Sequence, residues 1–160
     1  MALRKPLVIV SGQIEQLQSG DTLDATITDQ EIVSATNSNA GALTIGMAVY
    51  IDGNDSVDKA QADASGTKDV FGLCADVSIS AAATGDILTD GILTATTGQW
   101  DAVTGQSGGL TAGSRYYLDP NTAGLLSTTA PTTVGDYVVP VGVALSTISM
   151  KLDIDTDVLL

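Results

Sequence analysis

Aspartate is the residue type in this sequence with the most obvious capacity for chemistry. The chain has 19 acidic and six basic residues, and Asp153, Asp155 and Asp157 stand at every second position. In an extended strand this spacing places the three carboxylates on one face. The opposite face would then carry Leu152, Ile154, Thr156 and Val158. A metal ion could bridge the three acids around a symmetry axis, but we favour a solvated acidic face backed by a buried one.

A second acidic stretch, Asp52–Asp58, loosely resembles a calcium-binding loop. An EF-hand loop needs glycine at its sixth position and normally glutamate at its twelfth. These positions hold Val57 and Asp63 here. We therefore expect a solvated turn, and we predict no metal site and no cofactor.

Other catalytic residue types are nearly absent. The chain has no histidine, which excludes Ser-His-Asp and Cys-His catalysis and the common zinc sites. The nucleophile elbow and the glycine-rich phosphate and dinucleotide loops are also missing from the sequence. Two carboxylates suffice for glycoside hydrolysis, but one tryptophan, four tyrosines and one phenylalanine are few for a sugar-binding cleft. We predict that the protein is not an enzyme, and a carboxylate hydrolase remains as a minor alternative.

Cys74 is the single cysteine of the chain, so it has no intrachain disulfide partner. It lies in the apolar run 71–75. A free cysteine in such a run behaves as a small apolar residue. We therefore expect Cys74 to be a core residue rather than a nucleophile.

The formal net charge is −13, which opposes binding to nucleic acid or to anionic lipid. We predict no nucleic-acid partner, no membrane partner, no signal peptide and no transmembrane span. Charged residues make up 16% of the chain, compared with about 25% in typical soluble domains. This low share of charge, with a mean hydropathy of +0.26, indicates that other subunits cover part of the surface.

Short β-branched runs separated by turn residues predict an all-β fold with a sandwich or barrel-like body. Helix periodicity is weak throughout. The expected strands are Leu7–Val10, Ala25–Thr28, Met47–Ile51, Val70–Ala75, Ile87–Thr94, Arg115–Leu118 and Tyr137–Val143.

The chain divides into an N-terminal arm, residues 1–20, and a body, residues 21–160. Within the body, residues 21–39 alternate as in a half-buried strand pair. Residues 43–52 and 110–119 share Leu, Thr, Gly, Tyr and Asp at matching places, and each segment is followed by a turn and later by a valine-rich strand around a glycine. We expect an internal duplication with units 40–87 and 107–154.

A turn-rich loop, residues 96–109, separates the two units and carries Trp100. Long loops in compact domains are often functional. We weigh two roles for Trp100, an anchor for a partner and a side chain tucked over the edge of the core, and the second is the better supported.

The arm and the second unit resemble structural proteins of tailed bacteriophages. The arm segment that carries this resemblance is Lys5-Pro-Leu-Val-Ile-Val-Ser-Gly-Gln-Ile-Glu-Gln-Leu-Gln-Ser-Gly-Asp-Thr-Leu23. Residues 96–119, 124–131 and 140–145 are similar to modules of capsid-decoration, head-fibre and tail-fibre proteins. The resemblance covers most of the chain but consists of turn and core patterns.

For a chain this short, the resemblance implies a capsid decoration, or cement, protein on the outer surface of the virion. Such a protein would bind the major capsid protein and itself, as a homotrimer, and would stabilise the head. The alternative is a tail-fibre or head-fibre module that attaches to host glycans. Our candidate partner-binding residues are Leu7, Val8, Ile9, Ile14, Leu17, Trp100, Leu159 and Leu160.

Overall fold

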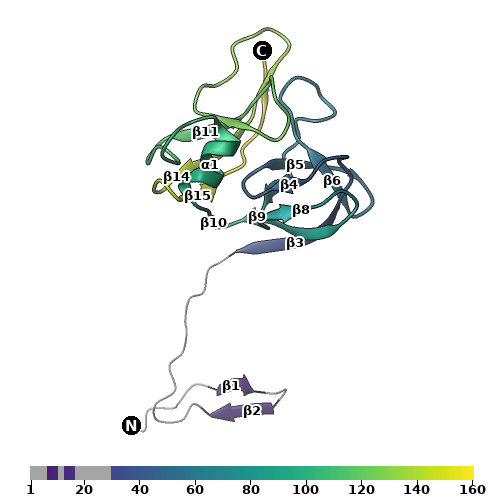
Figure 1. The fold of residues 1–160 in the computed structure, drawn as a ribbon, viewed down its shortest axis with the longest axis vertical. Helices are drawn as coiled ribbons and strands as arrows, with labels where there is room; N and C mark the ends of the chain where they lie inside the picture. Colours follow the sequence, from purple (N-terminus) through teal and green to yellow (C-terminus); the bar gives the residue numbers. More distant parts are fainter. Residues whose placement is uncertain (1–6, 11–12, 17–29) are drawn as a thin grey trace.

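The computed structural model describes residues 7–10, 13–16 and 30–160 (Figure 1). Five strands of the body form a closed barrel in the order β3-β6-β5-β7-β9. Neighbouring strands are antiparallel except for β3 and β6, which run parallel. The barrel strands are β3 (Glu31–Asn37), β5 (Ala48–Gly53), β6 (Ser56–Lys59), β7 (Gly72–Cys74) and β9 (Thr84–Asp90).

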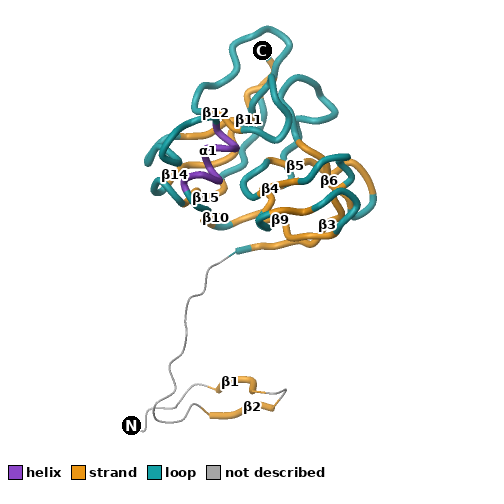
Figure 2. The backbone as a smooth tube through the Cα atoms, viewed as in Figure 1, coloured by secondary structure: helices purple, strands orange, loops and turns teal. Residues whose placement is uncertain are grey.

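A second sheet of five strands follows the barrel in sequence and lies beside it (Figure 2). Its order is β10-β15-β14-β11-β12, with antiparallel pairing throughout. Helix α1 (Thr97–Thr104) lies against this sheet. The strands are β10 (Ile92–Thr94), β11 (Arg115–Leu118), β12 (Leu126–Ser127), β14 (Pro140–Ala144) and β15 (Ser149–Leu152).

Three short antiparallel strand pairs complete the described structure. The first pair is β1 with β2, in the predicted arm. The second is β4 with β8, and the third is β13 with β16. Their bounds are Leu7–Val10 for β1, Gln13–Gln16 for β2, Leu43–Thr44 for β4, Ser78–Ile79 for β8, Tyr137–Val138 for β13 and Val158–Leu159 for β16.

One apolar core joins the barrel to the second sheet. Ala48 and Leu73 of the barrel belong to the same buried cluster as Tyr116, Leu118 and Met150 of the second sheet. A smaller cluster fills the barrel itself, with Val49, Val57, Cys74 and Ile87 among its members. The predicted all-β class and the barrel-like body are therefore confirmed.

The turns before β5 and β11 have the same geometry. Gly46 and Gly113 have φ angles of +87° and +81°, values that glycine adopts without steric cost. The N–H of Gly46 donates to Cys74 O at 2.9 Å, and the N–H of Gly113 donates to Ala144 O at 2.8 Å. The turn before β5 is therefore bonded to β7, which pairs with β5. In the same way, the turn before β11 is bonded to β14, which pairs with β11.

The strands that follow these turns also correspond. Val49 pairs with Gly72 in the barrel, and Tyr116 pairs with Gly142 in the second sheet. A Cβ at either glycine would collide with a carbonyl oxygen of the next strand, β9 or β15. Because both sets of contacts recur in the two segments of the sequence repeat, we propose that residues 40–87 and 107–154 are duplicated units.

The strand predictions differ in how closely they match the structure. The predicted strands 7–10 and 115–118 have the bounds of β1 and β11. The predicted strand 87–94 is divided at Gly91, whose φ is +112°, into β9 and β10. Residues 25–28 lie outside the described residues.

Candidate functional site

The acidic turn at residues 52–58 is held by hydrogen bonds to a carboxylate. Asp52 accepts from the hydroxyl groups of Ser38 at 2.6 Å and of Ser56 at 2.8 Å. These two bonds, with Ser38 the larger cause, lower the pKa of the Asp52 carboxyl below its ordinary value. The turn itself consists of Asn54 and Asp55, both exposed, between β5 and β6, while Val57 of β6 is buried. Within the described ranges no cluster of three or more metal-ligating side chains occurs.

The aspartates at 153–157 do not form the predicted strand with one buried face. Strand β15 ends at Leu152, and Ile154, expected to be buried, has 36% of its surface exposed. Asp153 pairs with Arg115 at 3.0 Å, and Asp157 pairs with Lys68 at 3.1 Å. Two carboxylates that were expected to share one face thus each bind a different cation.

Cys74 lies inside the barrel with no exposed surface. Burial raises the pKa of its thiol to about 12 because the thiolate is poorly solvated there. The prediction that Cys74 is a core residue is confirmed.

One of the candidate contact residues, Trp100, does not lie at the surface. Residues 96–109 are not a structureless loop, because α1 begins after the N-cap Thr96 and ends at Gly105. The helix places the Trp100 side chain in the core with no exposed surface, and the indole N–H donates to Ile148 O at 3.0 Å. Trp100 therefore stabilises the core and is not available to a partner at the surface.

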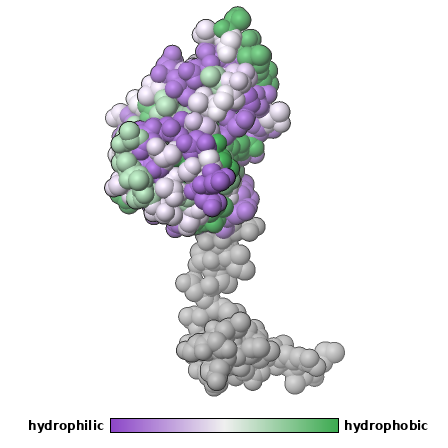
Figure 3. Space-filling view, turned by 90° about the vertical axis from the view of Figure 1, so that its right-hand side faces the viewer, coloured by the Kyte–Doolittle hydropathy of each residue, from purple (hydrophilic) through white to green (hydrophobic). Residues whose placement is uncertain are grey.

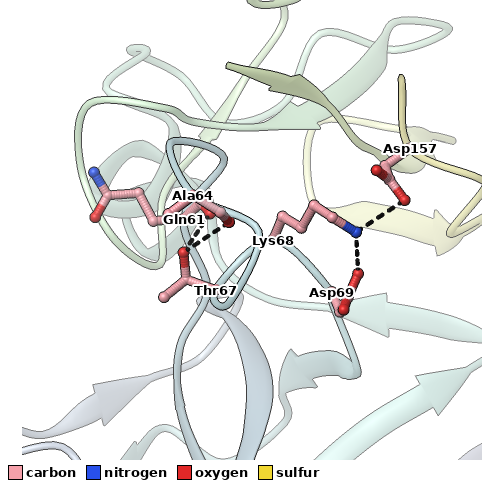
Figure 4. Close-up of polar contacts among 6 residues, drawn as sticks. All are labelled: Gln61, Ala64, Thr67, Lys68, Asp69 and Asp157. Atoms are coloured by element: carbon pink, nitrogen blue, oxygen red, sulfur yellow. Dashed lines mark hydrogen bonds and ion pairs between the residues drawn. The ribbon is translucent and has the colours of Figure 1, made fainter. Parts of the chain in front are cut away.

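The segment that ends the chain is held against the body by a loop, residues 61–69 (Figure 4). Within this loop the Thr67 hydroxyl lies within hydrogen-bonding distance of the carbonyl oxygens of Gln61 and Ala64. Lys68 projects from it to Asp69 and Asp157. Both partners raise the pKa of the Lys68 ammonium, and Asp69 is the larger cause.

The same lysine contacts the strand pair β13–β16. Its Nζ lies 5.2 Å from the centre of the Tyr137 ring, a distance suited to a cation–π contact. Tyr137 of β13 pairs in turn with Leu159 of β16. The backbone bonds Gly135 N–H to Leu160 O and Leu160 N–H to Asp136 O, each 3.0 Å, close the pair. The end of the chain is thus ordered on the body.

This ordered segment exposes a row of apolar side chains, which we call the C-terminal apolar surface. Green, hydrophobic atoms mark it at the top of the space-filling view (Figure 3). Its members are Val134, Val158, Leu159 and Leu160, with exposed fractions of 88%, 58%, 58% and 39%. Two of these, Leu159 and Leu160, were predicted as contact residues. Val134 was not, although an apolar side chain beside Gly135 in a turn was a usable signal.

The other predicted contact residues lie in the arm. Leu7, Val8 and Ile9 are in β1, and Ile14 is in β2. Ile9 pairs with Ile14 in the register of these strands. Leu17 lies outside the described residues. The structure therefore brings four of the predicted residues into one strand pair and two into the C-terminal apolar surface.

Among the described residues, no helix has the length and apolar character needed to cross a membrane.

Comparisons with known proteins give a structural similarity only. No protein-family model matches the chain, and no curated protein matches it. The chain is similar to a chain of a solved structure described as the capsid of Myoviridae phage XM1, with 18% sequence identity and a TM-score of 0.47. The similarity covers 90% of this chain and 94% of that chain.

Proposed function

We propose that the chain is a tailed-bacteriophage decoration protein that binds the outer surface of the capsid and stabilises the head without catalysing a reaction. The observation that carries this proposal is an ordered body that leaves many large apolar side chains exposed. They are Ile32, Val33, Ile51, Val77, Ile92, Val134, Leu145, Ile148, Ile154, Val158, Leu159 and Leu160. Where such side chains form one contiguous patch, as in the C-terminal apolar surface, they mark a surface that another protein covers.

The phage assignment is supported by the sequence resemblance of the arm and of the second unit. The structure adds two features that suit assembly. The arm contains its own strand pair, and the C-terminal apolar surface is fixed by Lys68 and by backbone bonds to β13. A fixed apolar surface loses little conformational entropy when a partner covers it.

The mechanism is mechanical. A decoration protein that buries surface on two neighbouring capsid subunits raises the free energy needed to separate them. Copies with a formal charge of −13 repel one another, so apolar burial must outweigh this repulsion. Added salt screens the repulsion and should strengthen assembly.

Co-sedimentation with capsids that lack the protein tests the proposal. We expect the full chain to bind, and a chain without residues 1–20 to lose binding while its body stays folded by circular dichroism. Failure of the full chain to bind would refute the capsid role, and full binding by the shortened chain would refute the role of the arm.

A host-attachment module is the alternative implied by the same resemblance. Its expected glycan contact was Trp100, which has no exposed surface. The alternative has therefore lost the aromatic side chain on which it depended.

A further inference from the structure

The wall of the barrel has an opening beside the first half of β3. Strand β3 pairs with β9 along Glu31–Thr36, but on its other side it pairs with β6 only at Thr36 and Asn37. Strand β6 begins at Ser56, opposite Thr36. The part of β3 before Thr36 is therefore an edge, and we call it the β3 edge, residues 32–34.

The backbone groups of the β3 edge are available for pairing. The N–H of Thr36 points to the β6 side, where it donates to Asp55 O at 2.8 Å. Because backbone groups alternate along an antiparallel strand, those of Ile32 and Ser34 point to the same side. Within the described part of the chain, the ladders and other backbone bonds give these two residues no partner there. Such an edge is a template for another strand.

An apolar cavity lies directly beside this edge. It has a volume of about 100 Å³, and its lining residues are Val33, Ala35, Ile51, Val57 and Phe71, together with Ser34, Asp55 and Ser56. An apolar cavity of about 150 Å³ holds a benzene molecule, so this one suits a branched aliphatic side chain. Backbone pairing combined with a pocket for one side chain is how proteins bind an added strand.

Strand β1, Leu-Val-Ile-Val from Leu7 to Val10, has the properties needed to pair with the β3 edge. It is already extended, and among the described residues it pairs only with β2. A two-stranded hairpin of this kind is marginally stable by itself in water, and a third strand would stabilise it. Each residue of β1 can supply a branched aliphatic side chain to the cavity.

Charge also matches β1 to the β3 edge. Arg4 and Lys5 precede β1, and residues 1–20 contain Glu15 as their single acid. The rest of the chain therefore carries four basic and eighteen acidic residues. The cavity lining includes Asp55 and no cation, and the edge begins beside the exposed Glu31. The charge of the segment that contains β1 is thus opposite to that of the edge.

We propose that β1 of one copy of this chain pairs with the β3 edge of a second copy and inserts an aliphatic side chain into the cavity. The described start of the body favours a second copy. Glu31 pairs with Asp90 of β9, and the Gln30 amide donates to Ile92 O, so the first described residues of the body bond to β9 and β10, on the side of β3 opposite the edge. Donor and acceptor are different surfaces, so the contact is heterologous, and a heterologous contact can close into a ring.

Disulfide trapping in the full-length chain tests this pairing. One chain carries Ser34→Cys, and a separate chain carries one introduced cysteine, in place of Val8, Ile9 or Val10. Cys74 is buried in both chains and does not interfere. Mixing the chains under mild oxidation can give a mixed disulfide only between copies. Since a cross-strand disulfide needs Cα atoms about 4.4–6.8 Å apart, only alternate donor positions should react.

We expect at least a tenfold higher yield of mixed dimer for the reactive donor positions than for a control acceptor, Ser80→Cys, which is exposed near the other end of β3. Yields no higher than the control would overturn the proposal. Equal yields at neighbouring donor positions would overturn strand pairing. A double variant that forms only an internal disulfide would overturn the second copy as occupant.

This inference goes beyond the proposed function, because it concerns contacts between copies of this chain and not contacts with the capsid. The experiment contains no capsid, so a negative result would leave the capsid-binding test undecided. If the protein forms the trapped dimers but does not bind capsids, strand pairing between copies is supported and the capsid role is refuted.

Discussion

The ring of Trp100 packs against Gly46 and occupies the space into which a side chain at position 46 would project. A Cβ at Gly46 would lie 3.0 Å from Cζ3 of Trp100. Gly46 precedes β5 of the barrel, and Trp100 belongs to α1, beside the second sheet. The contact therefore joins the two parts of the body at a point where the backbone also needs a φ of +87°.

Gly46→Ala should destabilise the protein for both reasons, crowding against Trp100 and a left-handed backbone. We expect a decrease of about 1–3 kcal/mol in the free energy of unfolding, measured by chemical denaturation. Gly98→Ala is the matched control, because Gly98 lies inside α1 with open space around it. That change should stabilise the protein by about 0.5–1 kcal/mol. Wild-type stability in Gly46→Ala would contradict the packing described above.

The Cys74 thiol should be inert in the native protein. Burial raises its pKa to about 12, so roughly one thiol in ten thousand is ionised at pH 8, and the thiolate is the reactive form. Titration with a chromogenic disulfide reagent should show no reaction in buffer and complete reaction in denaturant. Rapid reaction in buffer at pH 8 would show that the barrel interior is open.

Acid should weaken the turn at Asp52. The folded-state pKa of this carboxyl lies below its ordinary value, so its contribution to stability is present above about pH 4 and is lost as pH falls through the folded pKa. Asp52→Asn should therefore show a smaller loss of stability between pH 6 and acid than the wild type. Ser38→Ala removes the main hydrogen-bond donor and should have the same effect. If both variants keep the wild-type pH dependence, these bonds do not set the pKa.

The C-terminal apolar surface should contribute to association and little to folding. Leu159 is 58% exposed, so Leu159→Ser should change the free energy of unfolding by no more than about 0.5 kcal/mol. It should shift the sedimentation-velocity distribution toward the monomer. Leu152→Ser, at a buried position, is the control that should unfold the body. An unchanged distribution for Leu159→Ser would remove this surface from the assembly.

The sequence predicted what depends on local pattern. The alternation and turn residues around Arg115–Leu118 were sufficient to place β11, and the apolar run around Cys74 was sufficient to place it in the core. The closure of the barrel was not predictable in this way. It depends on β3 and β6 running in parallel, a pairing between residues far apart in the chain that no local pattern encodes.

Helix α1 was missed although its signals were present. Thr96 and Gln99 form a capping box, and Gly105 ends the helix in the left-handed region. Eight residues are too few for a clear apolar period. The strand expected at residues 153–157 was wrong for a different reason. The alternation of residue types does not show which cation each carboxylate meets, and in the structure Asp153 pairs with Arg115 whereas Asp157 pairs with Lys68.

Cryo-electron microscopy of the parent phage particle tests the central claim most directly. We predict density for the all-β body on the outer surface of the head, in contact with neighbouring capsid subunits around a symmetry axis. Density for this chain confined to the tail, or a virion without it, would contradict the claim.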